Sequence, residues 1–577
     1  MLKLGCYLKR FCVLVFIAIG FMAFQAVAEL SLPKVMADMV NHGMQAGDIN
    51  YVLKRGPTMI GLALFSALSS IGGSFFAARV AAGVGRDLRR DIFKKVTDIS
   101  LDEFQEIGAA SLITRNTNDI TQIQNILVIM FRFMIYSPLM CIGGIVMAYT
   151  VDNGLTKILA YVLPLMLLFI IGISIYIMPM FTRLQKYVDR LNMIVRENLI
   201  GIRVIRAFNR QEYERNRFDE ANKDLTDLAI RINKVMAATM PVVMLFMNVS
   251  ALLIVWFGGL RASYGDIEVG SIMAFLQYAM QIMFSIVMMM MMFVMLPRAE
   301  ASAVRINQVL NLENTVLDEG IQIPLERDGK VEFIDVTYRY KGAEEPALQG
   351  ISFTAEPGQV TAIIGGTGSG KTTLVSLIPR LYDVESGSVK VNGIDVREQP
   401  LKVLRNSLGF VSQKATLFSG SISDNIRYGK ENATDEEVRR AARIAQADGF
   451  IEEMAEGYDS IIAQGGTNVS GGQKQRISIA RVLLRKPQIY VFDDSFSALD
   501  FKTDANLRKA LKDEARGATQ IVIAQRISTI MDADKIIVLD EGRIAGKGTH
   551  KELMKTCRIY REIAKSQLSE EELDHEQ

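Results

Sequence analysis

The residues best suited to chemistry lie between Gly365 and Thr372, where the chain reads G-G-T-G-S-G-K-T. A glycine-rich backbone can curl around phosphate groups, and the amides that begin a helix attract anions. This segment follows a strand-like run at 360–364 and precedes a helical pattern, which is the context of a phosphate-binding loop. We therefore predict that Lys371 contacts the β- and γ-phosphates of ATP and that the Thr372 hydroxyl contacts Mg²⁺. The residues predicted to hold the nucleotide are Gly365, Gly366, Thr367, Gly368, Ser369, Gly370, Lys371, Thr372 and Thr373.

A carboxylate follows a second apolar run. Residues 489–492 read as a buried strand, and Asp493 comes directly after them. A strand that ends in an aspartate means little in isolation. Beside a phosphate-binding loop, however, such a carboxylate is placed to hold a Mg²⁺ ion. The expected cofactors are therefore ATP and Mg²⁺.

A third motif runs from Val469 to Gln473. Its exposed amides precede a helix, an arrangement that suits an anion. The segment resembles the signature motif of ATP-binding cassette (ABC) transporters. The resemblance implies that two cassettes enclose two ATP molecules, and that each signature loop covers the γ-phosphate held by the opposite phosphate-binding loop. The residues assigned to this role are Ser470, Gly471, Gly472 and Gln473.

The same resemblance covers the whole chain and assigns further roles. It implies that Tyr340 stacks on adenine and that Gln413 contacts both Mg²⁺ and the membrane domain. Residues 497–500 resemble the loop that crosses the dimer interface. Segments 104–119 and 196–208 are similar to the cytoplasmic loops of type IV ABC exporters, which implies short coupling helices near 103–109 and 209–216.

Two positions depart from the family, and both concern hydrolysis. The family has a glutamate after the Mg²⁺ aspartate, where it polarises the attacking water, and this chain has Asp494. The family also has a histidine that contacts the γ-phosphate, and this chain has Gln525. Removing one methylene withdraws the carboxylate by about 1 Å, and misplacement on that scale can slow catalysis about a hundredfold. We predict that Asp494, Gln525 and Gln413 form a catalytic group that hydrolyses ATP slowly.

The composition indicates a membrane protein of more than one domain. The chain has 577 residues, of which 50% are hydrophobic, and its mean hydropathy is +0.20. The apolar residues concentrate before Pro297. The net charge of +2 gives no indication of a nucleic-acid partner. The four cysteines are scattered and predict neither a disulfide framework nor a metal site.

Six stretches reach the length of about 20 apolar residues that a helix needs to cross a bilayer. Basic residues crowd the loops after the second and fourth stretches, and such charge marks the cytoplasmic side. We therefore expect both termini in the cytoplasm, and a multi-pass protein in the plasma membrane of a bacterium. Residues 1–28 also resemble a signal peptide, but the later spans favour an uncleaved first helix. The six predicted spans are 11–31, 58–82, 126–150, 155–179, 236–260 and 272–296.

The predicted fold class is multidomain, with an all-α six-helix transmembrane domain followed by an α/β P-loop ATP-binding cassette domain. The predicted boundaries are 1–310 for the transmembrane domain, 311–329 for a linker and 330–577 for the nucleotide-binding domain. Apart from Arg132, we expect no ionisable residue deep in the spans. Residues 288–292 are all methionine; they either pack against lipid and core or form a surface for varied apolar ligands.

These features predict ATP-driven export of amphipathic compounds by one half of a heterodimer. The pattern resembles the non-catalytic half of heterodimeric bacterial multidrug exporters. The partners then expected are a second ABC half-transporter with an intact catalytic glutamate and switch histidine, the lipid bilayer and a small amphipathic substrate. Two alternatives stay open: a homodimeric lipid or peptide flippase, and an ATP-gated regulator that does not pump. The apolar spans exclude a soluble ATPase.

Overall fold

The computed structural model describes residues 5–318, 320 and 328–567. Residues 319 and 321–327, which belong to the predicted linker, lie outside the described residues.

The chain forms two compact units. The first comprises residues 1–97 and 110–311, and the second comprises residues 98–109 and 312–577. The short segment 98–109 therefore belongs to the unit that contains the cassette, although it lies between two long helices of the first unit.

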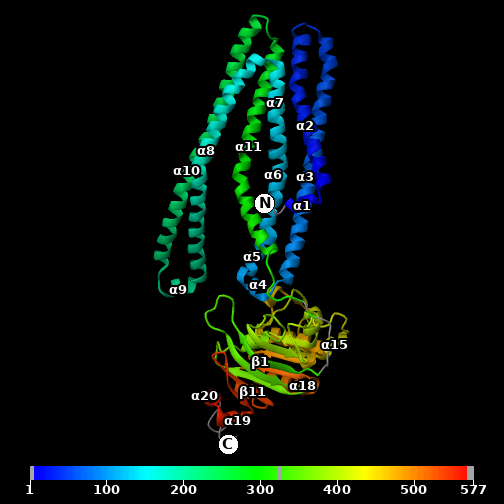
Figure 1. Cartoon of the computed structure of the whole chain (residues 1–577), viewed down its shortest axis with the longest axis vertical. Coiled ribbons are helices and arrows are strands. Elements are labelled where there is room, and N and C mark those ends of the chain that lie inside the picture. The colour runs from blue at the N-terminus through cyan, green and yellow to red at the C-terminus, as the bar shows by residue number, and fades with distance from the viewer. Residues whose placement is uncertain (1–4, 319, 321–327, 568–577) are drawn as a thin grey trace. The chain divides into compact units, whose positions relative to one another are not determined.

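The first unit is helical (Figure 1). Among the described residues, six helical stretches are long and apolar enough to cross a membrane, which confirms the predicted six-helix transmembrane domain. The stretches include three π-helical segments, η2, η3 and η4. The elements are α1 (Gly5–Lys9), α2 (Cys12–Asp38), η2 (Met39–Met44), α3 (Ile49–Asp98), α5 (Ala109–Thr114), η3 (Arg115–Asp119), α6 (Ile120–Met130), η4 (Phe131–Tyr136), α7 (Ser137–Val151), α8 (Asn153–Ile200), α9 (Ile202–Ala207), α10 (Gln211–Ser263) and α11 (Val269–Leu310).

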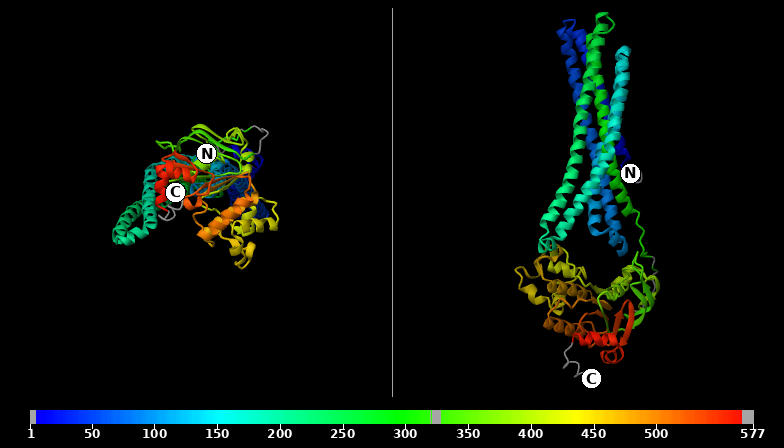
Figure 2. Two further views of the ribbon diagram at one scale, coloured as in Figure 1. Left: turned by 90° about the horizontal axis from the view of Figure 1, so that it is seen from below. Right: turned by 90° about the vertical axis from the view of Figure 1, so that its left-hand side faces the viewer.

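Three of these helices are much longer than a bilayer is thick. Helices α3, α8 and α10 contain 50, 48 and 53 residues. At about 1.5 Å per residue each extends over about 70–80 Å, whereas the hydrocarbon core is about 30 Å thick. The predicted helical extensions of the basic loops are thus continuous with the spans. Helices α8 and α10 pack along each other as a long hairpin (Figure 2).

A carboxylate in the first helical stretch has several polar partners. The first span was expected to end at residue 31, but its helical stretch continues to Met44, so Glu29 lies near its middle. The Glu29 carboxylate accepts hydrogen bonds from Ser66 Oγ at 3.0 Å, from Gln25 Nε2 at 2.9 Å and from the Tyr136 hydroxyl. A polar group in hydrocarbon is costly unless it has such partners. Three donors from three spans therefore make this carboxylate tolerable.

Helix α11 lies at the centre of the first unit and packs against α2 and α7. Phe275, Tyr278 and Ile282 on α11 are fully buried, so van der Waals packing against neighbouring helices, and not contact with lipid, surrounds these side chains. Met289 and Met290 also pack against this core. The side chains of Met291 and Met292 lie outside the described ones.

The second unit is built on a six-stranded sheet with the order β12-β11-β3-β10-β9-β6. The strands from β11 to β6 are parallel to their neighbours, and β12 is an antiparallel edge strand. Because parallel strands end at the same edge, the loops after β3 and β9 meet there. The strands are β3 (Val360–Gly365), β6 (Leu408–Val411), β9 (Ile489–Asp493), β10 (Thr519–Ile523), β11 (Lys535–Asp540) and β12 (Arg543–Gly548).

A four-stranded antiparallel sheet, β2-β1-β4-β5, shares an apolar core with this parallel sheet. A second core forms among the helices that follow β6. This arrangement confirms the predicted α/β cassette domain. The remaining strands are β1 (Val331–Tyr338), β2 (Leu348–Ala355), β4 (Ser386–Val391), β5 (Ile394–Asp395), β7 (Gly420–Ser421) and β8 (Ile461–Ile462). The helices are α4 (Leu101–Ile107), α12 (Lys371–Ser376), α13 (Leu401–Ser407), α14 (Ile422–Arg427), α15 (Asp435–Ile444), α16 (Asp448–Glu452), α17 (Gly471–Arg485), α18 (Phe501–Glu514), α19 (His550–Thr556) and α20 (Arg558–Lys565).

Candidate nucleotide-binding site

The phosphate-binding loop connects β3 to α12. A side chain at Gly365 would bring its Cβ within 2.1 Å of the Leu539 carbonyl oxygen on β11. Gly368 and Gly370 have φ of +83° and +94°, a region that glycine adopts without strain. Lys371 Nζ donates to the carbonyl oxygen of Gly365 at 2.9 Å, so the ammonium lies along the loop. Glycine at these positions thus allows the loop to curl closely in front of the sheet.

The predicted Mg²⁺ ligands meet at the ends of two strands. Thr372 Oγ1 donates to Asp493 Oδ1 at 3.1 Å, and Asp493 is almost fully buried. Burial raises the pKa of Asp493, although the hydroxyl of Thr372 and the backbone amide of Gln413 oppose this shift. A hydroxyl and a carboxylate are hard oxygen donors of the kind that Mg²⁺ prefers. The residues therefore fit this ion, which would supply positive charge to the phosphates of ATP.

Asp494 lies beside the Mg²⁺ aspartate and is held by two amide groups. Its Oδ2 accepts hydrogen bonds from Gln525 Nε2 at 2.7 Å and from Gln413 Nε2 at 3.3 Å. The backbone of Asp494 has a φ of +47°, which is uncommon for a residue other than glycine. Gln413 therefore contacts both aspartates, Asp493 through its backbone and Asp494 through its side chain. The structure thus brings together all three residues of the predicted catalytic group.

Tyr340 lies next to the helix that follows the phosphate-binding loop. Its hydroxyl shares a hydrogen bond of 2.8 Å with Thr373 Oγ1. Its ring is packed edge-on against Tyr338 and Tyr382, with ring centroids 5.0 and 5.7 Å apart. These contacts fix the position of the ring that is predicted to stack on adenine.

The signature loop has a different environment. Ser470 caps α17: its Oγ accepts from the Gln473 amide at 3.3 Å, and Gln473 Oε1 accepts from the Ser470 amide at 2.8 Å. A Cβ at Gly472 would lie 3.0 Å from the Ala498 carbonyl oxygen, so α17 begins against the 497–500 loop. Ser470 is exposed. Within the described part of this one chain, no hydrogen bond joins the signature loop to the phosphate-binding loop.

Helix α4, in the segment predicted to contain the first coupling helix, packs within the second unit. Leu101 lies against the apolar core, and Gln105 Nε2 donates to the Tyr382 hydroxyl at 3.2 Å. Lys341, next to Tyr340, forms an ion pair of 2.7 Å with Glu106. Sequence reasoning missed Tyr382 and Lys341 because neither stands in a motif, and Gln105 is 277 residues from its partner. Contacts thus run from the predicted adenine-stacking ring to α4.

Two family models match the chain. The model of the ABC transporter transmembrane region matches residues 15–287, and the ABC transporter model matches residues 348–497. An ABC transporter ATP-binding protein of Mycobacterium tuberculosis is 42% identical over 546 residues, which cover 94% of each chain. Another from Bacillus subtilis is 39% identical over 565 residues and 98% of each chain.

Other similar proteins carry more specific names. An ATP-dependent lipid A-core flippase of Hahella chejuensis is 32% identical over 518 residues, which cover 89% of this chain and 88% of the flippase. Among solved structures, a bacterial Atm1-family ABC exporter with ATP bound aligns with a TM-score of 0.81. It shares 24% sequence identity, and the alignment covers 98% of this chain and 100% of that exporter. This last likeness establishes the fold alone.

Replacing the loop lysine tests the phosphate contacts. We expect Lys371→Ala to weaken ATP binding by about ten- to a hundredfold, because hydrogen bonds to a charged group each contribute about 1.5–3 kcal/mol. Binding of a fluorescent ATP analogue to the purified transporter measures this loss. Lys402→Ala, at an exposed lysine on α13, is the matched control. Equal binding by both variants would contradict the assigned role.

The contacts of α4 predict which of its interactions dominates. The ion pair between Lys341 and Glu106 joins side chains that are 65% and 62% exposed, so Lys341→Ala should cost little stability. Leu101→Ala removes apolar contact with the core and should cost about 1–3 kcal/mol. Hydrogen exchange of the α4 amides should accelerate clearly in the leucine variant and little in the lysine variant. The reverse order would show that charge, not burial, holds α4.

Proposed function

The chain belongs to the ABC transporters that fuse a transmembrane region to an ATP-binding domain, and it has the form of an ATP-driven half-transporter. From this premise we propose that the chain is the hydrolysis-impaired half of a heterodimeric exporter. Its cargo in this proposal is an amphipathic compound or drug. The proposal places the protein in the bacterial plasma membrane with both termini in the cytoplasm, as the basic loops favour.

The observation that carries the proposal is the hydrogen bonding of Asp494. One carboxylate oxygen accepts from both Gln525 and Gln413. An oxygen that already accepts two amide hydrogen bonds is a weaker acceptor for the proton of an attacking water. The shorter side chain also stands farther from the phosphate than a glutamate would, and a displacement of about 1 Å can cost about a hundredfold in rate.

The features that support ATP binding remain in place around this altered group. The loop glycines, Lys371, the Thr372–Asp493 pair and Tyr340 keep the relation to one another that nucleotide binding needs. Binding with slow hydrolysis suits a site in which ATP holds two cassettes together for longer than one transport cycle. The second site, formed with a partner that has a glutamate and a histidine, would then supply the rapid hydrolysis.

The signature loop of this chain supports a contribution to that second site. Ser470 is exposed at the start of α17, and its capping hydrogen bonds fix the loop. A helix start with free amides binds anions. Since the loop has no hydrogen bond to the phosphate-binding loop of its own chain among the described residues, we propose that it covers the γ-phosphate bound by the partner subunit.

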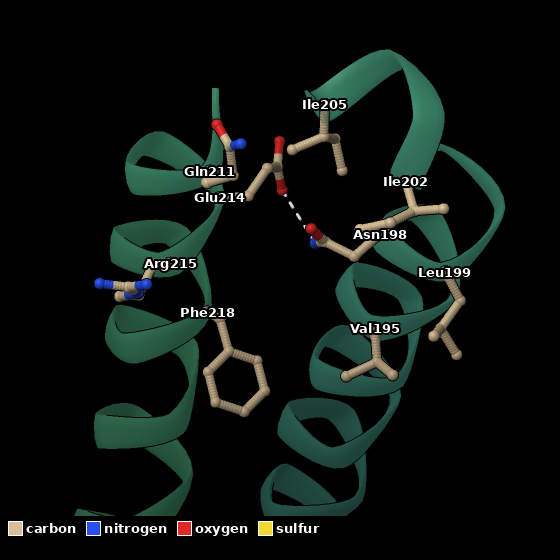
Figure 3. A pocket seen from close by; sticks show the side chains of 9 residues that line it. All are labelled: Val195, Asn198, Leu199, Ile202, Ile205, Gln211, Glu214, Arg215 and Phe218. Carbon is tan, nitrogen blue, oxygen red and sulfur yellow. Dashed lines mark hydrogen bonds between the residues drawn. The ribbon is translucent and has the colours of Figure 1, made fainter. Parts of the chain in front are cut away.

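The turn of the α8–α10 hairpin offers a surface for the partner subunit. A cavity of about 310 Å³ opens between α8, α9 and α10 (Figure 3), where Asn198 Nδ2 donates to Glu214 Oε2 at 3.0 Å. Apolar side chains of the lining are exposed in the single chain, with Leu199 at 72% and Ile202 at 42%. Exposed apolar surface of this kind marks an interface. The short helix α9 ends at Ala207, before the segment 209–216 that is predicted to contain the second coupling helix.

A lipid or lipid-like cargo is the second candidate. It is favoured by the similarity to a protein named as a lipid A-core flippase. A flippase would act on a molecule that already lies in the membrane, whereas a drug exporter would also accept compounds from water. Both candidates share the ATP-binding halves described above.

Restoring the family residues tests the impaired site. The double substitution Asp494→Glu and Gln525→His should raise ATP turnover of the assembled transporter about tenfold or more, because it returns a carboxylate to within reach of the attacking water. Phosphate release by the purified complex measures this rate. Asp494→Asn, which removes the carboxylate, should not raise it. An active ATPase formed by this chain alone, with the same rate as the complex, would contradict the heterodimer.

A bulky charge in the signature loop tests its action across the dimer. Ser470→Arg should lower total ATP turnover at least about tenfold, because the side chain would occupy the space for the γ-phosphate of the partner's site. Loss of the cap costs only about 1 kcal/mol, so folding should survive. Ser470→Thr keeps the capping hydroxyl and is the control. Unchanged turnover in the arginine variant would refute the role across the dimer.

A further inference from the structure

A large cavity lies within the helical unit, between α8, α11 and the helical stretch from η3 to α6. Its volume is about 740 Å³, which is enough for a drug-sized molecule. We call it the interhelical cavity. Amide, hydroxyl and charged side chains line one part of it, and apolar side chains line the other. The polar members are Asn118, Asp119, Gln122, Ser174, Thr182, Gln185, Ser302 and Arg305, and the apolar members include Ile173, Ile177, Met178, Phe181, Met236 and Met290.

An ion pair in the polar part presents its cation to the cavity. Asp119 is 0% exposed, whereas the Arg305 side chain is 44% exposed. Both oxygens of Asp119 are occupied: Oδ2 accepts from Arg305 Nε at 2.7 Å, and Oδ1 accepts from Ser302 Oγ at 2.9 Å and from Arg305 Nη2. Among the described residues, Arg305 Nη1 has no hydrogen-bond partner. A ligand therefore meets a guanidinium and not a carboxylate.

A second guanidinium adds positive charge to the same place. Arg115 Nη1 donates to the Arg305 backbone carbonyl at 3.1 Å, and its Nε is buried with no partner in the described part of the chain. Two guanidinium groups thus surround one buried carboxylate. The charges of Asp119 and Arg305, the charged side chains among the described lining residues, balance each other. Arg115, bonded to the Arg305 carbonyl, adds one positive charge beside this pair, which favours an anion.

Part of the cavity lining belongs to the predicted spans. Along α8, Ile173 and Ile177 lie within the predicted span at 155–179, and apolar lining continues beyond it to Val188. Along α11, Met290 lies within the predicted span at 272–296, whereas Ser302 and Arg305 follow it. The polar end of α11 and the apolar lining of α8 therefore face the same cavity.

We propose that the interhelical cavity binds one anionic amphiphile, with its headgroup at Arg305 Nη1 and its apolar chain along Ile177, Met236 and Met290. The proposal rests on the proposed export function, because it names the class of cargo. The amides of Gln122 and Gln185 supply further hydrogen-bonding groups beside the guanidinium. A carboxylate, sulfate or phosphate headgroup satisfies this chemistry, whether it belongs to a free amphiphile or to a phospholipid. Charge-assisted hydrogen bonds to arginine are about twice as strong as neutral ones.

A matched pair of probes isolates the charge of the headgroup. The probes are 11-(dansylamino)undecanoate and its methyl ester, which have the same chain and differ in the negative charge. Their affinities are measured by fluorescence titration of the transporter with its partner subunit, in nanodiscs of phosphatidylcholine and without nucleotide. Because no ATP is present, failure of the slow-hydrolysis proposal cannot change this result.

We expect the acid to bind at least about tenfold more tightly than the ester. Arg305→Gln alone would leave Asp119 buried and unpaired, which can unfold the helices. The double variant Asp119→Asn and Arg305→Gln keeps the hydrogen-bonding shape without charge, and it should bring the affinity ratio of acid to ester close to one. Gln122→Glu should also lower this ratio. Gln308→Glu, on an exposed position of α11 outside the cavity, should leave it unchanged.

Equal binding of acid and ester to the natural protein would overturn the proposal, as would an unchanged ratio in the double variant. Inorganic phosphate should not displace the acid probe, because it lacks the apolar chain; displacement at equal concentration would also overturn it. Nanodiscs with phosphatidylglycerol distinguish the two sources. Weaker probe binding there supports a phospholipid as the occupant, and unchanged binding supports a free amphiphile.

Discussion

The packing of α4 in the cassette is the contact by which a segment between two membrane helices belongs to the ATP-binding unit. By chain order α4 lies between two helices of the membrane unit, yet the partly buried Leu101 packs against the core that the two sheets of the cassette share. Apolar burial of this kind is non-directional and does not weaken with salt, unlike the exposed pair of Glu106 and Lys341. The chain before and after α4 is therefore tied to the domain that binds ATP.

The nucleotide site joins this helix through aromatic contacts. Tyr340 packs on Tyr382, whose hydroxyl accepts from Gln105 of α4. On the other side of the loop, Gln413 bonds to both aspartates. These contacts connect the nucleotide site to α4.

Two carboxylates inside the helical unit show how polar groups are accommodated there. Glu29 accepts from three spans, and Asp119 is paired with Arg305 and Ser302. The Glu29 cluster and the Asp119–Arg305 pair differ in whether a charged side chain faces a cavity. Glu29 has its donors within the spans, whereas the Asp119 pair leaves a guanidinium partly open to the interhelical cavity. That difference separates a structural polar cluster from a candidate binding site.

The sequence by itself determined the two-domain architecture, the six spans and the identity of the loops that bind phosphate. Those features depend on local order along the chain: apolar runs of bilayer length, a strand followed by glycines and lysine, and a Ser-Gly-Gly-Gln segment before a helix. The sequence also shows the two departures from the family, Asp494 and Gln525. It does not show that Gln525 donates a hydrogen bond to Asp494. Only the tertiary structure shows that contact, the hydrogen-bond partners of Glu29 and the pairing of Gln105 with Tyr382. It also shows that Arg305, and not Asp119, is the exposed member of their ion pair. Each of these joins residues that are far apart in the chain or shows which side of a pair is exposed, and neither property leaves a local pattern in the sequence.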